Sequence, residues 1–248
     1  MLNLPKRNNK PRNTGITSLH DISLTTKLLE SILDEHHEFI DLAKLGIGTA
    51  YITPNLKKKI EIYKSFNIEV YFGGTLFEKF YSQDKLDLYK KYLEDHQINS
   101  VEVSTGTLDL DIDKRVEIVK DFSKDFMVLS EVGSKDSEAV MAPSKWLHEI
   151  DSLFEAGSSY VITEGRDSGT AGMFRSNGEI RTGLLEDILN SSEIDKIIFE
   201  APTPASQIYF INKVGSNVNL GNINPYGVLQ LETQRQALRS DTFFLNDN

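Results

Sequence analysis

Four glutamates follow one another along the chain near the ends of apolar segments, where they could serve one site: Glu102, Glu131, Glu164 and Glu200. Each ends or follows a short run rich in β-branched residues, which predicts a strand. Carboxylates held close together repel one another unless a cation lies among them, and hard oxygen ligands favour Mg²⁺. We therefore expect these glutamates to include the ligands of a magnesium ion. The alternative is that some of them form structural ion pairs with basic side chains.

Three basic side chains lie near the same segment ends: Lys44, Lys135 and Arg166. Arg166 belongs to a glycine-rich segment, residues 164–172. Backbone N–H groups of such a loop can approach an oxyanion, and the guanidinium can bind it through two hydrogen bonds. The Gly-Gly-Thr segment at residues 73–75 offers the same backbone groups. Both segments predict binding of an anion, with a tight surface turn as the alternative.

The elements that must position these side chains are eight apolar segments that alternate with helical patterns. The predicted strands cover residues 15–19, 39–43, 68–72, 100–104, 126–130, 160–163, 196–199 and 217–220. Eight alternations in a chain of 248 residues match a single (β/α)8 barrel, with an open doubly wound sheet as the alternative. In a barrel, the carboxyl ends of the strands form the active-site face, and the glutamates and basic side chains fall there.

Some helix boundaries can also be predicted. Thr53-Pro54 and Thr203-Pro204 each place a capping hydroxyl before a proline at the first helical position. Gly215 offers a left-handed stop for the second of these helices. One longer helix is indicated by an apolar face made of Phe77, Phe80, Tyr81, Leu88 and Tyr92.

The composition excludes several classes of protein. With 27 Lys and Arg against 37 Asp and Glu, the net charge is -10, which argues against a nucleic-acid partner. The absence of cysteine rules out disulfides, thiolate metal sites and thiol nucleophiles. No run of eighteen apolar residues and no secretion signal is present, so we expect a cytoplasmic protein without a membrane partner. Residues 1–12 predict a flexible, solvated tail, followed by a barrel domain at 13–248.

Several short sequence motifs, taken in chain order, resemble those of the phosphosulfolactate synthase family. They are Asp41–Thr49, Gly73–Glu78, Val101–Ser104, Glu131–Lys135, Glu164–Gly169, Phe199–Pro202, Val218–Ile223, Leu231–Arg235 and Leu238–Thr242. The resemblance covers nearly the whole chain. It implies a Mg²⁺-dependent (β/α)8 lyase of coenzyme M biosynthesis. Such an enzyme adds sulfite to C3 of phosphoenolpyruvate and gives (2R)-2-phospho-3-sulfolactate.

The resemblance also suggests roles for the residues that match the motifs of this family. Mg²⁺ would stabilise the charge that develops on the substrate carboxylate. Lys135 would protonate C2 as a general acid, and Lys44 and Arg166 would hold substrate charge. The expected substrate-binding residues are Gly73, Gly74, Thr75, Asn219, Gly221 and Asn222. We also expect a homo-oligomer.

Four positions depart from the pattern of this family: Ser134, Gly165, Asp167 and Ala237 stand where Lys, Ala, Glu and Gly are usual. Two alternatives therefore stay open. One is a related enzyme that adds a different nucleophile to a phospho-enol acid, and the other is a non-catalytic, stress-associated protein on the same fold. In the last helical region, Arg235 and Arg239 could reach anions, contact a second subunit or form helix ion pairs.

Overall fold

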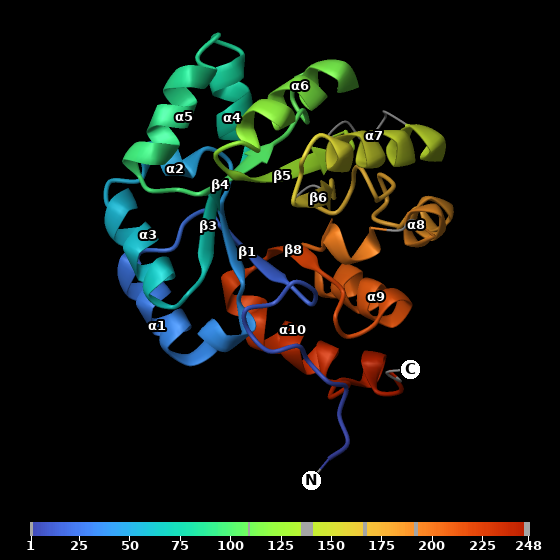
Figure 1. The fold of residues 1–248 in the computed structure, drawn as a ribbon. Coiled ribbons are helices and arrows are strands. Elements are labelled where there is room, and N and C mark those ends of the chain that lie inside the picture. The colour runs from blue at the N-terminus through green and yellow to red at the C-terminus, as the bar shows by residue number, and fades with distance from the viewer. Residues whose placement is uncertain (1, 109, 135–140, 166–167, 191–192, 246–248) are drawn as a thin grey trace.

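Eight parallel strands close into a barrel, each hydrogen-bonded to the next in chain order and β8 to β1 (Figure 1). The computed structural model describes residues 2–108, 110–134, 141–165, 168–190 and 193–245. The strands are β1 (Thr17–Asp21), β2 (Leu42–Leu45), β3 (Glu69–Phe72), β4 (Ser100–Val103), β5 (Met127–Val132), β6 (Tyr160–Thr163), β7 (Ile197–Glu200) and β8 (Leu220–Ile223). The prediction of a (β/α)8 barrel is confirmed.

Helices surround the barrel (Figure 1). They are α1 (Thr26–His36), α2 (Thr49–Ile52), α3 (Leu56–Ser65), α4 (Gly74–Tyr81), α5 (Leu86–Asp95), α6 (Ile112–Phe122), α7 (Pro143–Glu155), α8 (Thr182–Leu189), α9 (Pro204–Val214) and α10 (Val228–Arg235). Short 3₁₀ turns lie at His37–Phe39, Ile194–Lys196, Pro225–Gly227 and Ser240–Thr242. None of the described helices is long and apolar enough to cross a membrane.

The strands bury apolar side chains on both faces, because parallel strands in a barrel are covered outside by helices and inside by one another. Alternation along β2 shows the consequence: Leu42 packs inside the barrel, whereas Ala43 joins the layer between strands and helices. The interior cluster consists of Ile16, Leu42, Tyr71, Leu129, Ile162 and Ile198. Since side chains alternate along a strand, Lys44 returns to the interior above this packed floor.

The predicted helix boundaries have mixed outcomes. Thr203 caps α9 in a capping box with Ser206, and Gly215 ends this helix at a φ of +114°, as predicted. The start predicted at Thr53-Pro54 is wrong, because Thr53 ends α2 and α3 begins only at Leu56. The single long helix is also wrong: Asp84 adopts a φ of +55° between α4 and α5 and breaks the helical path.

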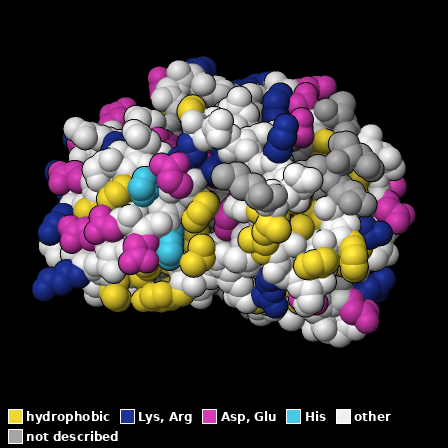
Figure 2. All heavy atoms as spheres, turned by 90° about the horizontal axis from the view of Figure 1, so that it is seen from below, with side chains coloured by type: hydrophobic (Ala, Val, Ile, Leu, Met, Phe, Trp, Pro, Cys, Tyr) yellow, Lys and Arg dark blue, Asp and Glu magenta, His cyan; other side chains and the backbone are white. Residues whose placement is uncertain are grey.

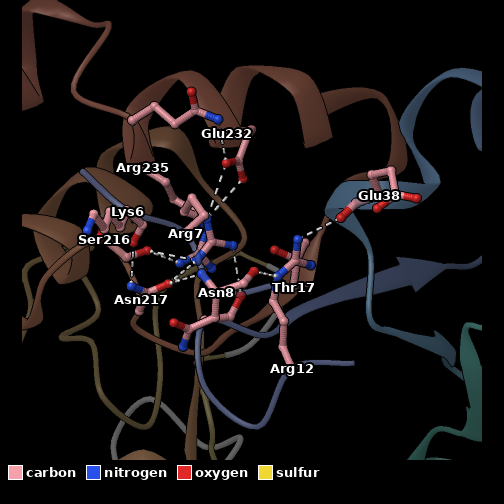
Figure 3. A network of polar contacts seen from close by, with 12 residues as sticks. Lys6, Arg7, Asn8, Arg12, Thr17, Glu38, Ser216, Asn217, Glu232 and Arg235 are labelled. Carbon is pink, nitrogen blue, oxygen red and sulfur yellow. Dashed lines mark hydrogen bonds and ion pairs between the residues drawn. The ribbon is translucent and has the colours of Figure 1, made fainter. Parts of the chain in front are cut away.

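The amino-terminal segment lies at the amino ends of β1, β2 and β8 and is joined to α10 through Glu232 (Figure 3). Arg7 Nε lies 3.2 Å from Glu232 Oε1, and Arg12 NH1 lies 2.9 Å from Asp41 Oδ1. Lys10 Nζ donates to the carbonyl oxygens of His37 and Ile40. The prediction of a solvated tail is therefore wrong for these three basic residues, whose charges are used to fasten the segment.

The outer surface mixes charges of both signs with apolar groups. On the face in Figure 2, Lys and Arg side chains lie among Asp and Glu side chains, with hydrophobic groups between them. The net charge of -10 is therefore not gathered into one acidic patch on this face. Binding of an anionic ligand must then depend on local groups and not on the overall charge.

Ala237 ends α10 in a conformation that suits glycine. Its φ is +56°, and the Leu238 N–H donates to the Thr233 carbonyl while the Ala237 N–H donates to Gln234, which is the Schellman pattern. The left-handed region is unfavourable for a residue with a Cβ. The departure from the family pattern at this position is thus conformational.

We expect Ala237→Gly to raise the free energy of unfolding by about 1 kcal/mol, because glycine removes the strain of the left-handed conformation. Urea denaturation measures the change. Ala205→Gly is the control, since Ala205 lies inside α9, where the same substitution should destabilise. Equal effects of both variants would contradict the prediction.

Candidate active site

A cavity of about 160 Å³ opens at the carboxyl ends of the strands, and every strand or the loop after it contributes to its lining. The lining residues are His20, Lys44, Gly46, Ile47, Gly73, Gly74, Thr75, Glu102, Glu131, Glu164, Glu200 and Asn222. All four glutamates are buried, each at 3% exposure or less. The structure thus brings together side chains that are separated by more than 180 positions in the sequence.

Lys44 is the central described cation of this cavity. Its Nζ lies 2.8 Å from Glu200 Oε1 and 3.8 Å from Glu102 Oε2. Burial alone would lower the pKa of Lys44, but Glu102 and Glu200 outweigh burial and hold that pKa well above its ordinary value. Lys44 therefore stays charged at neutral pH and is suited to orient substrate charge, not to donate a proton.

Two of the carboxylates also fix neighbouring loops. Glu102 Oε1 accepts a hydrogen bond of 2.7 Å from the Gly74 N–H, and Glu200 Oε2 accepts one of 2.9 Å from the Gly165 N–H. Burial would raise the pKa of Glu200, but Lys44 and the Gly165 N–H hold it below its ordinary value. A Cβ on Gly165 would lie 2.8 Å from Phe174 Cε2, so an alanine at this position would require a shift of the packing.

The cavity has two chemically different sides. Strands β4, β5 and β7 supply Glu102, Glu131 and Glu200, and Glu164 follows β6. Strands β8, β1 and β2 and the loop after β3 supply an amide, an imidazole, an ammonium and glycine backbone. A cation is favoured on the first side and an oxyanion on the second. Glu102 and Glu200 each form an ion pair with Lys44, so the alternative that some of the glutamates form ion pairs with basic side chains applies to these two.

The carboxylate side suits a magnesium ion in the chemistry of its donors. Mg²⁺ is commonly held by one or two carboxylates, with substrate oxygens and water completing the shell. Within the described residues, no group of three or more His, Asp or Glu side chains is arranged to hold a metal by itself. Any magnesium site here would therefore need oxygens from substrate or water besides the glutamates.

Not every predicted site residue lies at this cavity. Asn219 lies at the opposite end of β8, where its Oδ1 accepts from the Ile16 N–H at 3.0 Å and its Nδ2 donates to Asp195. Its predicted substrate-binding role is wrong, because the side chain fastens the amino ends of the strands. Gly221 is not among the lining residues; its backbone carbonyl accepts from the Ala201 N–H. Lys135 and Arg166 lie outside the described residues.

Arg235 has none of its predicted roles. It is fully buried, and its guanidinium donates to the backbone carbonyls of Ser216 and Val218, each at 2.7 Å, and of Ile16 at 3.1 Å. Burial, together with the nearby charge of Arg7, lowers the pKa of Arg235 well below its ordinary value. The side chain joins α10 to the amino ends of β1 and β8 (Figure 3).

His20 lines the cavity, although it is not among the site residues predicted from the sequence. It lies in β1, one residue before the end of that strand. A Cβ on Gly46 would lie 1.9 Å from His20 Nε2, so the imidazole occupies space that only glycine at position 46 leaves open. The available signal was its place at the end of the first predicted strand, on the active-site face.

Gly46→Ala is expected to displace His20 and lower activity at least tenfold, since a misplaced active-site group is costly to the rate. Steady-state kinetics of Gly46→Ala, His20→Ala and the double variant measure this effect. The double variant should be no worse than His20→Ala, because both changes act on the same side chain. Gly183→Ala is the control, because nothing lies within 4 Å of a Cβ there. Full activity of Gly46→Ala would refute the prediction.

The closed barrel and its polar cavity at the strand ends define a (β/α)8-barrel enzyme. Solved structures share the fold: 3-hexulose-6-phosphate synthase aligns with a TM-score of 0.56 at 13% identity, covering 88% of this chain and 98% of that one. Thiamine phosphate pyrophosphorylase from Pyrococcus furiosus aligns with a TM-score of 0.55 at 10% identity, covering 90% and 96%. These likenesses concern the fold alone.

The chain belongs to the phosphosulfolactate synthase family, because the family model "(2R)-phospho-3-sulfolactate synthase (ComA)" matches residues 5–241. It is 43% identical to phosphosulfolactate synthase of Bacillus subtilis over 247 residues, 98% of either chain. It is 39% identical to phosphosulfolactate synthase of Methanocaldococcus jannaschii over 236 residues, 92% of this chain and 94% of the relative. Protein HEAT-STRESS-ASSOCIATED 32 of Arabidopsis thaliana is 23% identical over 279 residues, 96% of this chain and 94% of the relative.

Proposed function

We propose that this protein is a phosphosulfolactate synthase that adds sulfite to C3 of phosphoenolpyruvate and gives (2R)-2-phospho-3-sulfolactate. Family membership over nearly the full length is the observation that carries the proposal. The cavity supports it, since one side is rich in carboxylates and the other offers groups for oxyanions. The proposal includes the route to coenzyme M, a cytoplasmic location and a homo-oligomeric state.

Different residues of the chain would bind the metal ion and orient the substrate. When bound, Mg²⁺ would stabilise the negative charge that develops on the substrate carboxylate as sulfite attacks C3. One or two of the four glutamates, Glu102, Glu131, Glu164 and Glu200, would hold this ion. The permanent charge of Lys44 would orient an anionic group of the substrate.

The phosphate side of the cavity would be served by backbone groups. Gly73, Gly74 and Thr75 begin α4, and the unpaired N–H groups of a helix start favour phosphate. The Gly73 N–H already donates to the Leu45 carbonyl and the Gly74 N–H to Glu102, so of these three N–H groups that of Thr75 would serve the ligand. Lys135 would donate a proton to C2, and Arg166 would bind phosphate or sulfonate. These two roles rest on the resemblance to the family.

The proposed function is tested by incubating purified protein with phosphoenolpyruvate, sulfite and Mg²⁺, and by identifying the product by mass spectrometry. Consumption of phosphoenolpyruvate should require sulfite, should stop with a chelator and should disappear in Lys135→Ala. Product formed with another nucleophile would favour the related-enzyme alternative. Absence of turnover and of any ligand-induced melting shift would favour the non-catalytic alternative.

A further inference from the structure

Strand β8 is irregular where it borders the cavity. Thr17 of β1 pairs with Leu220, but Leu19 pairs with Ile223, so β8 has one more residue than β1 between these two pairs. Asn222 lies in this stretch and adopts a φ of +55°. Bulges of this kind redirect a side chain and are common beside active sites. The irregularity therefore accompanies the placement of Asn222 at the cavity.

The side chain of Asn222 is buried but incompletely hydrogen-bonded. It is 5% exposed and lines the cavity, and its Oδ1 has no hydrogen-bond partner in the described structure. Burying an amide without its partners is unfavourable, and a left-handed φ in a residue other than glycine adds to the cost. A position that combines both features suggests that a ligand completes the hydrogen bonding. Because rotation of the amide about its terminal torsion exchanges Oδ1 and Nδ2, the carboxamide can turn its N–H donors toward an anion.

The chemistry of this group differs from that of its surroundings. Among the described lining residues, Asn222 is the single carboxamide, and it offers N–H donors as well as an acceptor without a formal charge. In a closed barrel of eight strands, β8 lies opposite β4, so Asn222 faces the wall that carries Glu102. It therefore lies on the side of the cavity that favours an oxyanion.

We infer that the Asn222 carboxamide binds the sulfite nucleophile and sets the preference of the site for it, an inference that rests on the proposed function. In the proposed function, Lys44 binds the carboxylate of phosphoenolpyruvate, and the Thr75 N–H at the start of α4, after β3, binds its phosphate. Sulfite must be held through its oxygens while its sulfur lone pair stays available for attack. A cation on those oxygens withdraws electron density from sulfur, whereas a neutral amide holds them with less withdrawal.

The test uses two matched variants of the full-length protein, Asn222→Gly and Asn67→Gly. Both remove a carboxamide at a φ of +55°, and glycine accepts this conformation, so folding should be retained in both. Asn67 is exposed and lies outside the cavity. We expect Asn222→Gly to raise the KM for sulfite at least tenfold with the KM for phosphoenolpyruvate within twofold. Asn67→Gly should change neither KM.

Several outcomes would overturn the inference. An unchanged KM for sulfite in Asn222→Gly would do so, and so would an equal rise in both KM values. If the wild-type protein shows no turnover, the proposed function fails, and calorimetric titration of sulfite in the presence of phosphoenolpyruvate decides the inference separately. Binding at least tenfold weaker in Asn222→Gly than in the wild type would support it. Equal binding, or no binding to the wild type, would refute it.

Discussion

Replacing Lys44 by methionine is expected to lower kcat/KM at least a thousandfold. Lys44 Nζ is 2.8 Å from Glu200 and 3.8 Å from Glu102, and it supplies a fixed positive charge inside a buried cavity. Removing one preorganised group that stabilises developing charge typically costs two to three orders of magnitude in rate. The loss should be larger here, since the substitution also leaves the carboxylates to repel an anionic substrate. Steady-state kinetics with phosphoenolpyruvate and sulfite measure the change.

The same substitution should also lower the free energy of unfolding by about 3–5 kcal/mol, because it leaves a buried carboxylate without this cation. The double variant Lys44→Met with Glu200→Gln should recover much of this stability but not the activity. Lys44→Arg, which keeps the charge, is the conservative control and should retain stability. A value of kcat/KM for Lys44→Met within tenfold of the wild type would show that this charge is not needed.

Acidity should reduce the instability of Lys44→Met. In the folded wild type, Lys44 holds the pKa of Glu200 below its ordinary value. The ion pair therefore stabilises the fold fully at pH values above the ordinary pKa of a glutamate. This stabilisation is lost as the pH falls through the lowered pKa of the folded state. Without Lys44, burial should raise the pKa of Glu200, and protonation then removes the unfavourable charge. The difference in unfolding free energy between wild type and variant should therefore narrow as the pH falls below neutral, as urea denaturation at several pH values would show.

Replacing Arg235 by methionine is expected to lower the free energy of unfolding by about 3–5 kcal/mol. Three buried carbonyl groups, those of Ile16, Ser216 and Val218, would lose hydrogen bonds from the guanidinium. The Val218 carbonyl would be left unsatisfied, which costs about 1–3 kcal/mol. The carbonyls of Ile16 and Ser216 keep hydrogen bonds from the Leu220 N–H and from Arg7, and each would lose about 0.5–1.5 kcal/mol. Methionine fills part of the space left by the guanidinium, which keeps the total loss at about 3–5 kcal/mol. The measurement is the midpoint and slope of urea unfolding.

Arg239→Met is the matched control for this prediction. Arg239 is partly exposed, its guanidinium lies 3.5 Å from Asp241, and exposed ion pairs contribute little. Its loss should change stability by less than about 0.5 kcal/mol. Because Arg235 lies away from the cavity, the folded Arg235→Met protein should keep a kcat close to the wild type at low temperature. Equal stabilities of the two variants would contradict the role given to Arg235.

Much of the fold could be predicted because its signals are local. The strands at Ser100–Val103 and Tyr160–Thr163 agree with the predicted segments to within one residue, and the capping hydroxyl of Thr203 before Pro204 was predicted from the sequence. The first and last strands lie two to three residues further along than predicted. Their apolar runs begin before the hydrogen-bonded ladder does, so the pattern alone misplaces the start.

The candidate site was predictable only in part, as two neighbouring asparagines show. Asn219 and Asn222 are three residues apart, yet Asn219, just before β8, binds backbone groups at the amino end of the barrel, and Asn222, within β8, lines the cavity at the carboxyl end. The sequence gives no sign of where the ladder of β8 begins or of its bulge. His20 was missed for a similar reason, since its place depends on the space left by Gly46 in the next loop.

By itself, the sequence determined the alternation of strands and helices and the position of a glutamate near the end of each of four consecutive strands. Local periodicity and β-branched composition carry that information within a few residues. Only the tertiary structure decided which charges meet: Lys44 with Glu200, 156 positions apart, and Arg7 with Glu232, 225 positions apart. Such pairs depend on closure of the barrel, because closure alone brings β1 beside β8 and turns the ends of all strands toward one cavity.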